Sequence, residues 1–104
     1  MAKYLFVYHG GAAPESAEDG EKAMAAWGAW FGQMGAGLVD PGEAVGRSHT
    51  VSKTGTTADG GANPASGYSV IEAETLDAAL AMARGCPMVA DGTGNVEVAP
   101  VMAM

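Results

Sequence analysis

The sequence has few of the residues on which catalytic and metal-binding motifs depend. It contains one cysteine and two histidines in 104 residues. A lone cysteine cannot form an internal disulfide, which favours a reducing, cytoplasmic location. The two histidines, His9 and His49, lie too far apart in the chain to form a metal-binding motif, and no Cys/His cluster accompanies them. We therefore expect no bound metal.

Positive charge is also scarce. Five basic residues stand against twelve acidic ones, so the net charge is −7 at pH 7. A surface this acidic repels phosphate backbones and anionic lipids, which makes nucleic acid and membranes poor partners. The sequence also lacks a P-loop, a dinucleotide-binding fingerprint and a G-x-S-x-G elbow, so we expect no cofactor.

Long hydrophobic runs are missing as well. The uncharged stretch 23–39 is interrupted by glycines and falls short of the roughly 20 apolar residues that a membrane span needs. At the N-terminus, the apolar run in MAKYLFVYHGG is short and no small-residue cleavage site follows it. It therefore predicts a first strand rather than a signal peptide.

What remains has the composition of one folded domain. Hydrophobic residues make up 48% of the chain, enough for a core, and the length fits a single domain over residues 1–104. The strand predicted at 3–9 is apolar on both faces, because Tyr4, Phe6 and Tyr8 alternate with Leu5 and Val7. Such a strand favours a sheet that is covered on both sides.

A first helix is predicted after Pro14, with Ser16 as its N-cap and acidic residues in the first turn. Gly28 and Gly32 lie one turn apart in this helix, and each costs about 1 kcal/mol relative to alanine. We therefore expect another backbone to pass close to them. The helix should stop at Gly35. Its apolar stripe consists of Met24, Trp27, Trp30, Phe31 and Met34.

The rest of the chain alternates between strands and turns, with one further helix. Leu38 and Val39 are expected to open a strand that a turn breaks at once, and residues 47–53 alternate weakly as the second strand. Residues 54–66 are polar and rich in glycine, which is typical of a mobile hairpin loop. The later elements are a strand at 68–74, a short helix capped by Thr75, and a last strand at 95–101.

The predicted order β-α-β-β-α-β is that of an α+β, ferredoxin-like fold with an antiparallel sheet. Two helices cover only one face of a four-stranded sheet. Because the first strand is apolar on both faces, a second copy of the chain is expected to pack sheet to sheet as a closed homodimer.

His9 and Asp40 are the candidate catalytic residues. His9 ends the first strand before two glycines that let a ligand approach, and an imidazole titrates near neutrality, so His9 is a candidate base. Asp40 would orient that imidazole and raise its basicity. The alternatives are a strand-end histidine bonded to solvent or to a carbonyl, and an aspartate that closes an Asx turn on its own backbone.

Three residues are candidates for ligand contacts. Trp27 would line an aromatic pocket, although aromatic residues at helical spacing are more often core. Tyr68 would place its hydroxyl in a cavity or pack at the sheet edge. Cys86 follows the second helix, whose dipole raises a thiol pKa, so a small buried hydrophobe in the pocket wall is favoured over a reactive thiolate. Gly85 before it is expected to be left-handed.

The stretches YLFVYHGG, AWGAWFGQMGAGLVDPG, GYSVIEAETLDAAL and the closing GCP and NVEVAPVM occur in this order along the chain. Together they resemble the YCII-related family, specifically its DGPF-type branch, and the resemblance runs nearly end to end. It implies a ferredoxin-like domain that dimerises into an α/β barrel. For most members it implies no assigned activity.

The chain departs from that family at two points. Core members carry a histidine in the first helix and an aspartate before the proline that follows the second helix, proposed as an active-site pair. The matching positions here fall near Met24 and on Cys86, so that chemistry does not carry over. The DGPF motif is also incomplete, because residues 59–62 read DGGA.

These observations predict a dimer that binds a small organic molecule in the cleft between sheet and helices, lined by Trp27, Tyr68 and His9. Two other functions stay open. One is a cofactor-independent lyase, isomerase or oxygenase that uses His9 and Asp40, argued from analogy of fold. The other is a regulatory module that binds another protein through residues 54–66.

Overall fold

The computed structural model describes residues 1–102 and contains a four-stranded antiparallel sheet with the order β2-β5-β1-β6. Strand β1 spans Ala2–Gly10, β2 Leu38–Asp40, β5 Ala65–Ala73 and β6 Gly94–Pro100. The first strand lies between β5 and β6 and is antiparallel to both. The predicted α+β, ferredoxin-like class is confirmed.

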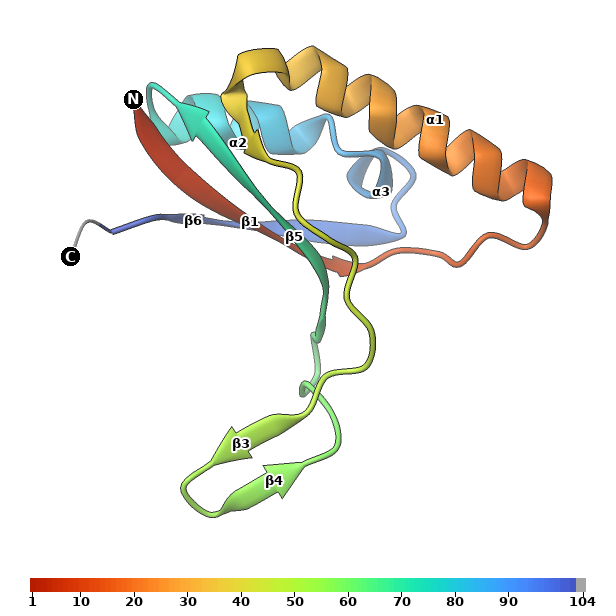
Figure 1. Cartoon of the computed structure of the whole chain (residues 1–104), viewed down its shortest axis with the longest axis vertical. Helices are drawn as coiled ribbons and strands as arrows, with labels where there is room; N and C mark the ends of the chain where they lie inside the picture. Colours follow the sequence, from red (N-terminus) through yellow and green to blue (C-terminus); the bar gives the residue numbers. More distant parts are fainter. Residues whose placement is uncertain (103–104) are drawn as a thin grey trace.

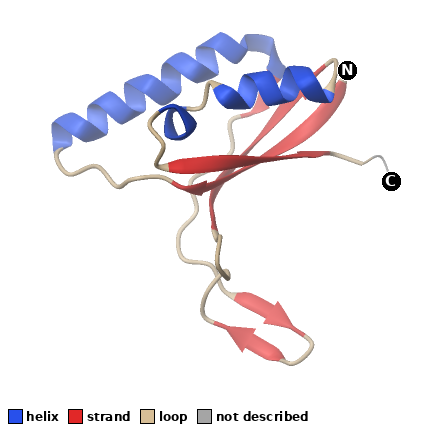
Figure 2. Cartoon of the chain, turned by 180° about the vertical axis from the view of Figure 1, so that it is seen from behind, coloured by secondary structure: helices blue, strands red, loops and turns tan. Residues whose placement is uncertain are grey.

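Helices lie on one face of this sheet (Figures 1 and 2). Helix α1 spans Ala17–Met34 and runs into a 3-10 turn at Gly35–Gly37, α2 spans Leu76–Arg84, and the single turn α3 spans Pro87–Ala90. Both predicted N-caps are confirmed. The backbone N–H of Asp19 donates to Ser16 Oγ, and that of Ala78 donates to Thr75 Oγ1, each at 3.1 Å.

The second strand of the sheet differs from the prediction. Leu38 of β2 pairs with Ile71 of β5, whereas the segment 47–53 contributes only β3 (Thr50–Ser52) to a separate hairpin with β4 (Gly55–Thr57). This hairpin arm, residues 50–57, extends away from the sheet and the helices (Figure 1). The prediction that residues 47–53 form the second strand of the sheet is therefore wrong. The hairpin arm buries no apolar face, and Val51 is 77% exposed.

The core lies between the helices and the sheet. Tyr4, Phe6 and Tyr8 alternate along β1 and are buried toward the helices. Trp30 of α1 packs against Phe6 and Tyr8, and its indole Nε1 donates to the Met82 carbonyl oxygen of α2 at 2.9 Å. Trp30 therefore links α1 to α2.

Three details of the helices depart from expectation. Met24, predicted to share the apolar stripe of α1, is 78% exposed. At Gly28 and Gly32, a Cβ would have no described atom within 4 Å beyond the neighbouring turns of α1 itself, so no other backbone among residues 1–102 passes close to them. Gly85 is right-handed, with φ of −80°, rather than left-handed. A Cβ at Gly85 would lie 3.2 Å from the Trp30 indole, so this glycine makes room for the tryptophan.

The opposite face of the sheet carries the other set of alternating residues. Leu5 pairs with Val70 and Ala99 on this face, and Val7 pairs with Tyr68. No helix of the described chain covers them (Figure 2). Within residues 1–102, no helix has both the length and the hydropathy to span a membrane.

Candidate functional site

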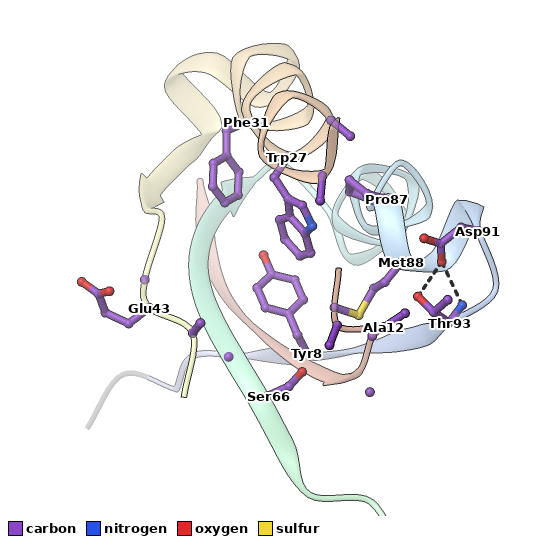
Figure 3. A pocket seen from close by; sticks show the side chains of 18 of the residues that line it. Tyr8, Ala12, Trp27, Phe31, Glu43, Ser66, Pro87, Met88, Asp91 and Thr93 are labelled. Carbon is purple, nitrogen blue, oxygen red and sulfur yellow. Dashed lines mark hydrogen bonds between the residues drawn. The ribbon is translucent and has the colours of Figure 1, made fainter. Parts of the chain in front are cut away.

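A cavity of about 790 Å³ lies between α1 and the sheet, beside α3 (Figure 3). Helix α1 supplies Trp27 and Phe31, β1 supplies Tyr8, α3 supplies Met88, and the segment after β2 supplies Glu43. A cavity of this volume with aromatic walls is typical of a site for a small organic molecule.

The aromatic walls hold one another in place. The rings of Tyr8 and Trp27 meet edge to face, with centroids 5.0 Å apart, and Trp27 meets Phe31 in the same way at 5.8 Å. Trp30 packs behind Trp27 with the centroids 5.5 Å apart. These contacts restrict the rings to one arrangement around the cavity.

The Tyr8 hydroxyl starts a chain of two hydrogen bonds. It donates to Ser69 Oγ at 2.7 Å, and Ser69 Oγ donates to the Pro41 carbonyl oxygen at 2.6 Å. Burial raises the pKa of Tyr8 to about 12, although the bond to Ser69 lowers it in part. The hydroxyl is therefore neutral around pH 7, and its oxygen keeps lone pairs for a further donor.

Asp91 closes the side of the cavity next to α3. Its Oδ1 accepts two hydrogen bonds from Thr93, one from the backbone N–H at 2.9 Å and one from Oγ1 at 2.6 Å. Figure 3 shows both bonds at the cavity edge. They lower the pKa of Asp91, so its carboxylate is charged at neutral pH.

Charge around the cavity is mainly negative. Three lining residues are acidic: Asp19, Glu43 and Asp91. Lys22 is the one basic residue among the described lining residues, and its Nζ lies 3.4 Å from Glu18 Oε1. The acid that pairs with Lys22 offsets the positive charge.

His9 lies on the other face of the sheet. Neighbouring residues in a strand point to opposite sides, so His9 points away from the cavity that Tyr8 lines. Its Nε2 lies 2.9 Å from Glu97 Oε1, and its Nδ1 lies 3.2 Å from the Pro64 carbonyl oxygen. Both partners can only accept, so both ring nitrogens donate when both bonds form, and the ring is then an imidazolium. Glu97 accordingly raises the pKa of His9 above its usual value.

Asp40 forms the Asx turn that was the alternative to a catalytic role. Its Oδ1 accepts a hydrogen bond from the Gly42 N–H at 2.8 Å. Since the His9 ring contacts Pro64 and Glu97, the structure does not bring His9 and Asp40 together. Neither residue is among the described residues that line the cavity.

The three predicted ligand-contact residues fall in different places. Trp27 lines the cavity, and Tyr68 borders it. Tyr68 pairs with Val7, however, so its side chain belongs to the face away from the helices. Cys86 is fully buried outside the cavity lining. Burial raises the pKa of the Cys86 thiol, and backbone N–H groups at the start of α3 offset this only in part.

Sequence reasoning missed the polar residues of the cavity. Strand alternation could have identified Tyr8, because only one of Tyr8 and His9 can face the same side as Trp27. The bond between Ser69 and Pro41 has no local sequence signal. Ser66, which also lines the cavity, has the one buried side-chain polar atom without a hydrogen-bond partner among residues 1–102.

Comparison with known proteins agrees with this fold. The sequence matches the YCII-related domain over residues 4–104. The chain belongs to the YCII-related family. The predicted family is thus confirmed, while the DGPF-type branch stays a prediction. Met24, near the first position of the pair that the resemblance implies, is 78% exposed, and Cys86, at the second position, is fully buried.

Among solved structures, this YCII-related chain is similar to 5-chloro-2-hydroxyhydroquinone dehydrochlorinase from Burkholderia phenoliruptrix AC1100 in complex with 2,5-dihydroxybenzoquinone. The TM-score is 0.56 and the identity 18%, over 96% of this chain and 95% of that chain. At this identity the likeness supports the fold alone. No curated protein sequence matches the chain.

Proposed function

We propose that this YCII-related protein binds a small planar organic molecule in the cavity between α1 and the sheet. The observation that carries the proposal is the cavity of about 790 Å³, walled by Tyr8, Trp27 and Phe31 and provided with a few polar groups. The similar dehydrochlorinase was solved with a small ring compound, which supports the same class of ligand.

Binding is favoured over the catalytic alternative. A reaction that used His9 and Asp40 would need both at the ligand, but one contacts Glu97 on the other sheet face and the other closes its own turn. The Tyr8 hydroxyl, one of those in the cavity lining, has a pKa of about 12, so it is protonated and a poor base near neutral pH.

A matched pair of substitutions tests the location of the site. Ala26 lines the cavity, whereas its neighbour Ala25 is exposed outside the lining. Ala26→Phe should fill part of the cavity and weaken binding of small aromatic compounds at least about tenfold, or ~1.4 kcal/mol. Ala25→Phe adds the same side chain to the same helix and should leave the affinity within about twofold.

Titration of the purified protein with a panel of such compounds, followed by tryptophan fluorescence and calorimetry, measures this difference. Equal affinities for the two variants would show that ligands bind elsewhere. Absence of any binding in the panel would reject the proposed function.

We also infer that two copies of the chain pair through the sheet face that the helices leave open. Val7 and Val70 lie there half-buried, and Tyr68 is 36% exposed. An apolar face of this kind favours a second copy as its cover. Light scattering after size exclusion should give a dimer at micromolar concentration, and Val7→Arg should give a folded monomer. Val51→Arg on the hairpin arm is the control, and a stable wild-type monomer would contradict the pairing.

A further inference from the structure

The direction of the hydrogen bonds at Tyr8 decides what a ligand must offer there. A carbonyl oxygen only accepts, so the single hydroxyl hydrogen of Ser69 is donated to the Pro41 carbonyl oxygen. Tyr8 must then give its own hydrogen to Ser69. In Figure 3 the Tyr8 hydroxyl points toward α1, between Trp27 and Phe31. Tyr8 Oη can therefore only accept a hydrogen bond from a ligand at this point, and the ligand must be the donor.

Trp27 offers the complementary group. No residue in the described range accepts a hydrogen bond from its indole Nε1, in contrast to Trp30, whose Nε1 donates to Met82. Figure 3 shows the Trp27 nitrogen on the side that faces α3. The cavity therefore presents an acceptor at Tyr8 and a donor at Trp27, on two rings whose centroids are 5.0 Å apart.

The charge of the lining acts on the ligand as a whole. Asp19, Glu43 and Asp91 are acidic, and Lys22, the one basic residue of the described lining, already pairs with Glu18. The chain as a whole carries a net charge of −7. Both the local and the overall charge repel an anion from the cavity.

We propose that the cavity selects phenols that carry no negative charge, with the phenol hydroxyl donating to Tyr8 Oη and an acceptor group of the same ligand facing Trp27 Nε1. This ligand class rests on the proposed function, because it assigns a chemistry to the same site. The proposed ligand class distinguishes this protein from proteins that bind aromatic acids, which place a cationic side chain opposite the ligand carboxylate.

Three compounds with one ring test the two requirements separately. Methyl 4-hydroxybenzoate has a donor and no charge, methyl 4-methoxybenzoate lacks the donor, and 4-hydroxybenzoate adds a carboxylate. We expect the first to bind about three- to tenfold more tightly than the methoxy compound, as one hydrogen bond provides. It should also bind more tightly than the acid. The difference in affinity between methyl 4-hydroxybenzoate and 4-hydroxybenzoate should decrease as ionic strength rises from about 0.01 M to about 0.15 M, since the Debye length falls from about 30 to about 8 Å.

Tyr8→Phe should remove the preference for hydroxyl over methoxy and leave the preference against the carboxylate. A merely structural effect would weaken all three compounds alike. Tyr4→Phe is the matched control, because Tyr4 lies in the same strand as Tyr8 but outside the cavity lining, and its two preferences should equal those of the wild type.

The possible results separate the ligand class from the function. If the methoxy compound or the acid binds as tightly as methyl 4-hydroxybenzoate, the ligand class is overturned, while the proposed function stands because ligands still bind. If none of the three binds, the ligand class is overturned as well. Whether the function then survives is decided by the wider panel and the Ala26→Phe variant.

Discussion

Replacing His9 with phenylalanine should destabilise the protein, and the loss should shrink as pH rises. In the wild type the imidazole bridges two acceptors, the Glu97 carboxylate at 2.9 Å and the Pro64 carbonyl oxygen at 3.2 Å. The His9 side chain is 8% exposed, so water cannot easily replace these partners. A phenyl ring fills similar space but donates neither bond.

The magnitude follows from the two bonds. A hydrogen bond to a charged group contributes about 1.5–3 kcal/mol, and one between neutral groups about 0.5–1.5 kcal/mol. The Glu97 side chain is 64% exposed, so solvent screens its charge and the lower ends of these ranges apply. We expect His9→Phe to cost about 2 kcal/mol while the ring is protonated. A neutral imidazole has one N–H, so the cost should fall to about 1 kcal/mol at high pH.

The sign of the pH dependence follows from the raised pKa of His9. The folded protein keeps a proton that the unfolded chain releases near pH 6.5, the usual histidine value. The stabilisation is therefore complete below about pH 6.5. It is lost as pH rises through the raised pKa of the folded state.

Urea unfolding followed by tryptophan fluorescence, from about pH 6 to about pH 9, measures this loss. The control is His49→Phe, which changes the other, exposed histidine and should cost less than about 0.5 kcal/mol at every pH. The reasoning is refuted if His9→Phe costs the same at both ends of the range, or no more than the control.

Two further predictions concern the core. Burial raises the pKa of the Cys86 thiol, so an alkylating reagent at neutral pH should label the native protein far more slowly than the unfolded chain; rapid labelling of the native protein would contradict the buried position. Trp30→Phe removes the bond to the Met82 carbonyl and leaves a smaller ring in a buried site, so it should cost about 2–4 kcal/mol in urea unfolding. A loss under about 0.5 kcal/mol would show that Trp30 does not tie the helices together.

The fold could be predicted largely from local patterns. The alternation at 3–9 predicted β1, and the hydroxyls of Ser16 and Thr75 marked both helix starts. The second strand could not be placed in this way. β2 is only three residues long, and it is defined by its pairing with Ile71 of β5, far away in the chain. The segment 47–53 had a stronger strand pattern than residues 38–40, although it lies outside the four-stranded sheet.

Less of the candidate site than of the fold could be predicted from the sequence. Trp27 was found because helical periodicity placed it on the inner face of α1. The partners of His9 lie 55 and 88 residues away, and only the register of β1 against its neighbours brings them to the ring. The Tyr8 chain depends likewise on Ser69, 61 residues away. Such contacts follow from topology rather than from spacing.

The two tryptophans allow the most direct test of the central claim, that a small aromatic ligand occupies the cavity between α1 and the sheet. An N–H correlation spectrum has one indole signal from Trp27 and one from Trp30, which Trp27→Phe assigns. Addition of methyl 4-hydroxybenzoate should shift the Trp27 signal, because that ring lines the cavity. The Trp30 signal should stay nearly unchanged, because its N–H donates to Met82. A ligand that binds and shifts neither signal, or shifts only that of Trp30, would contradict the account.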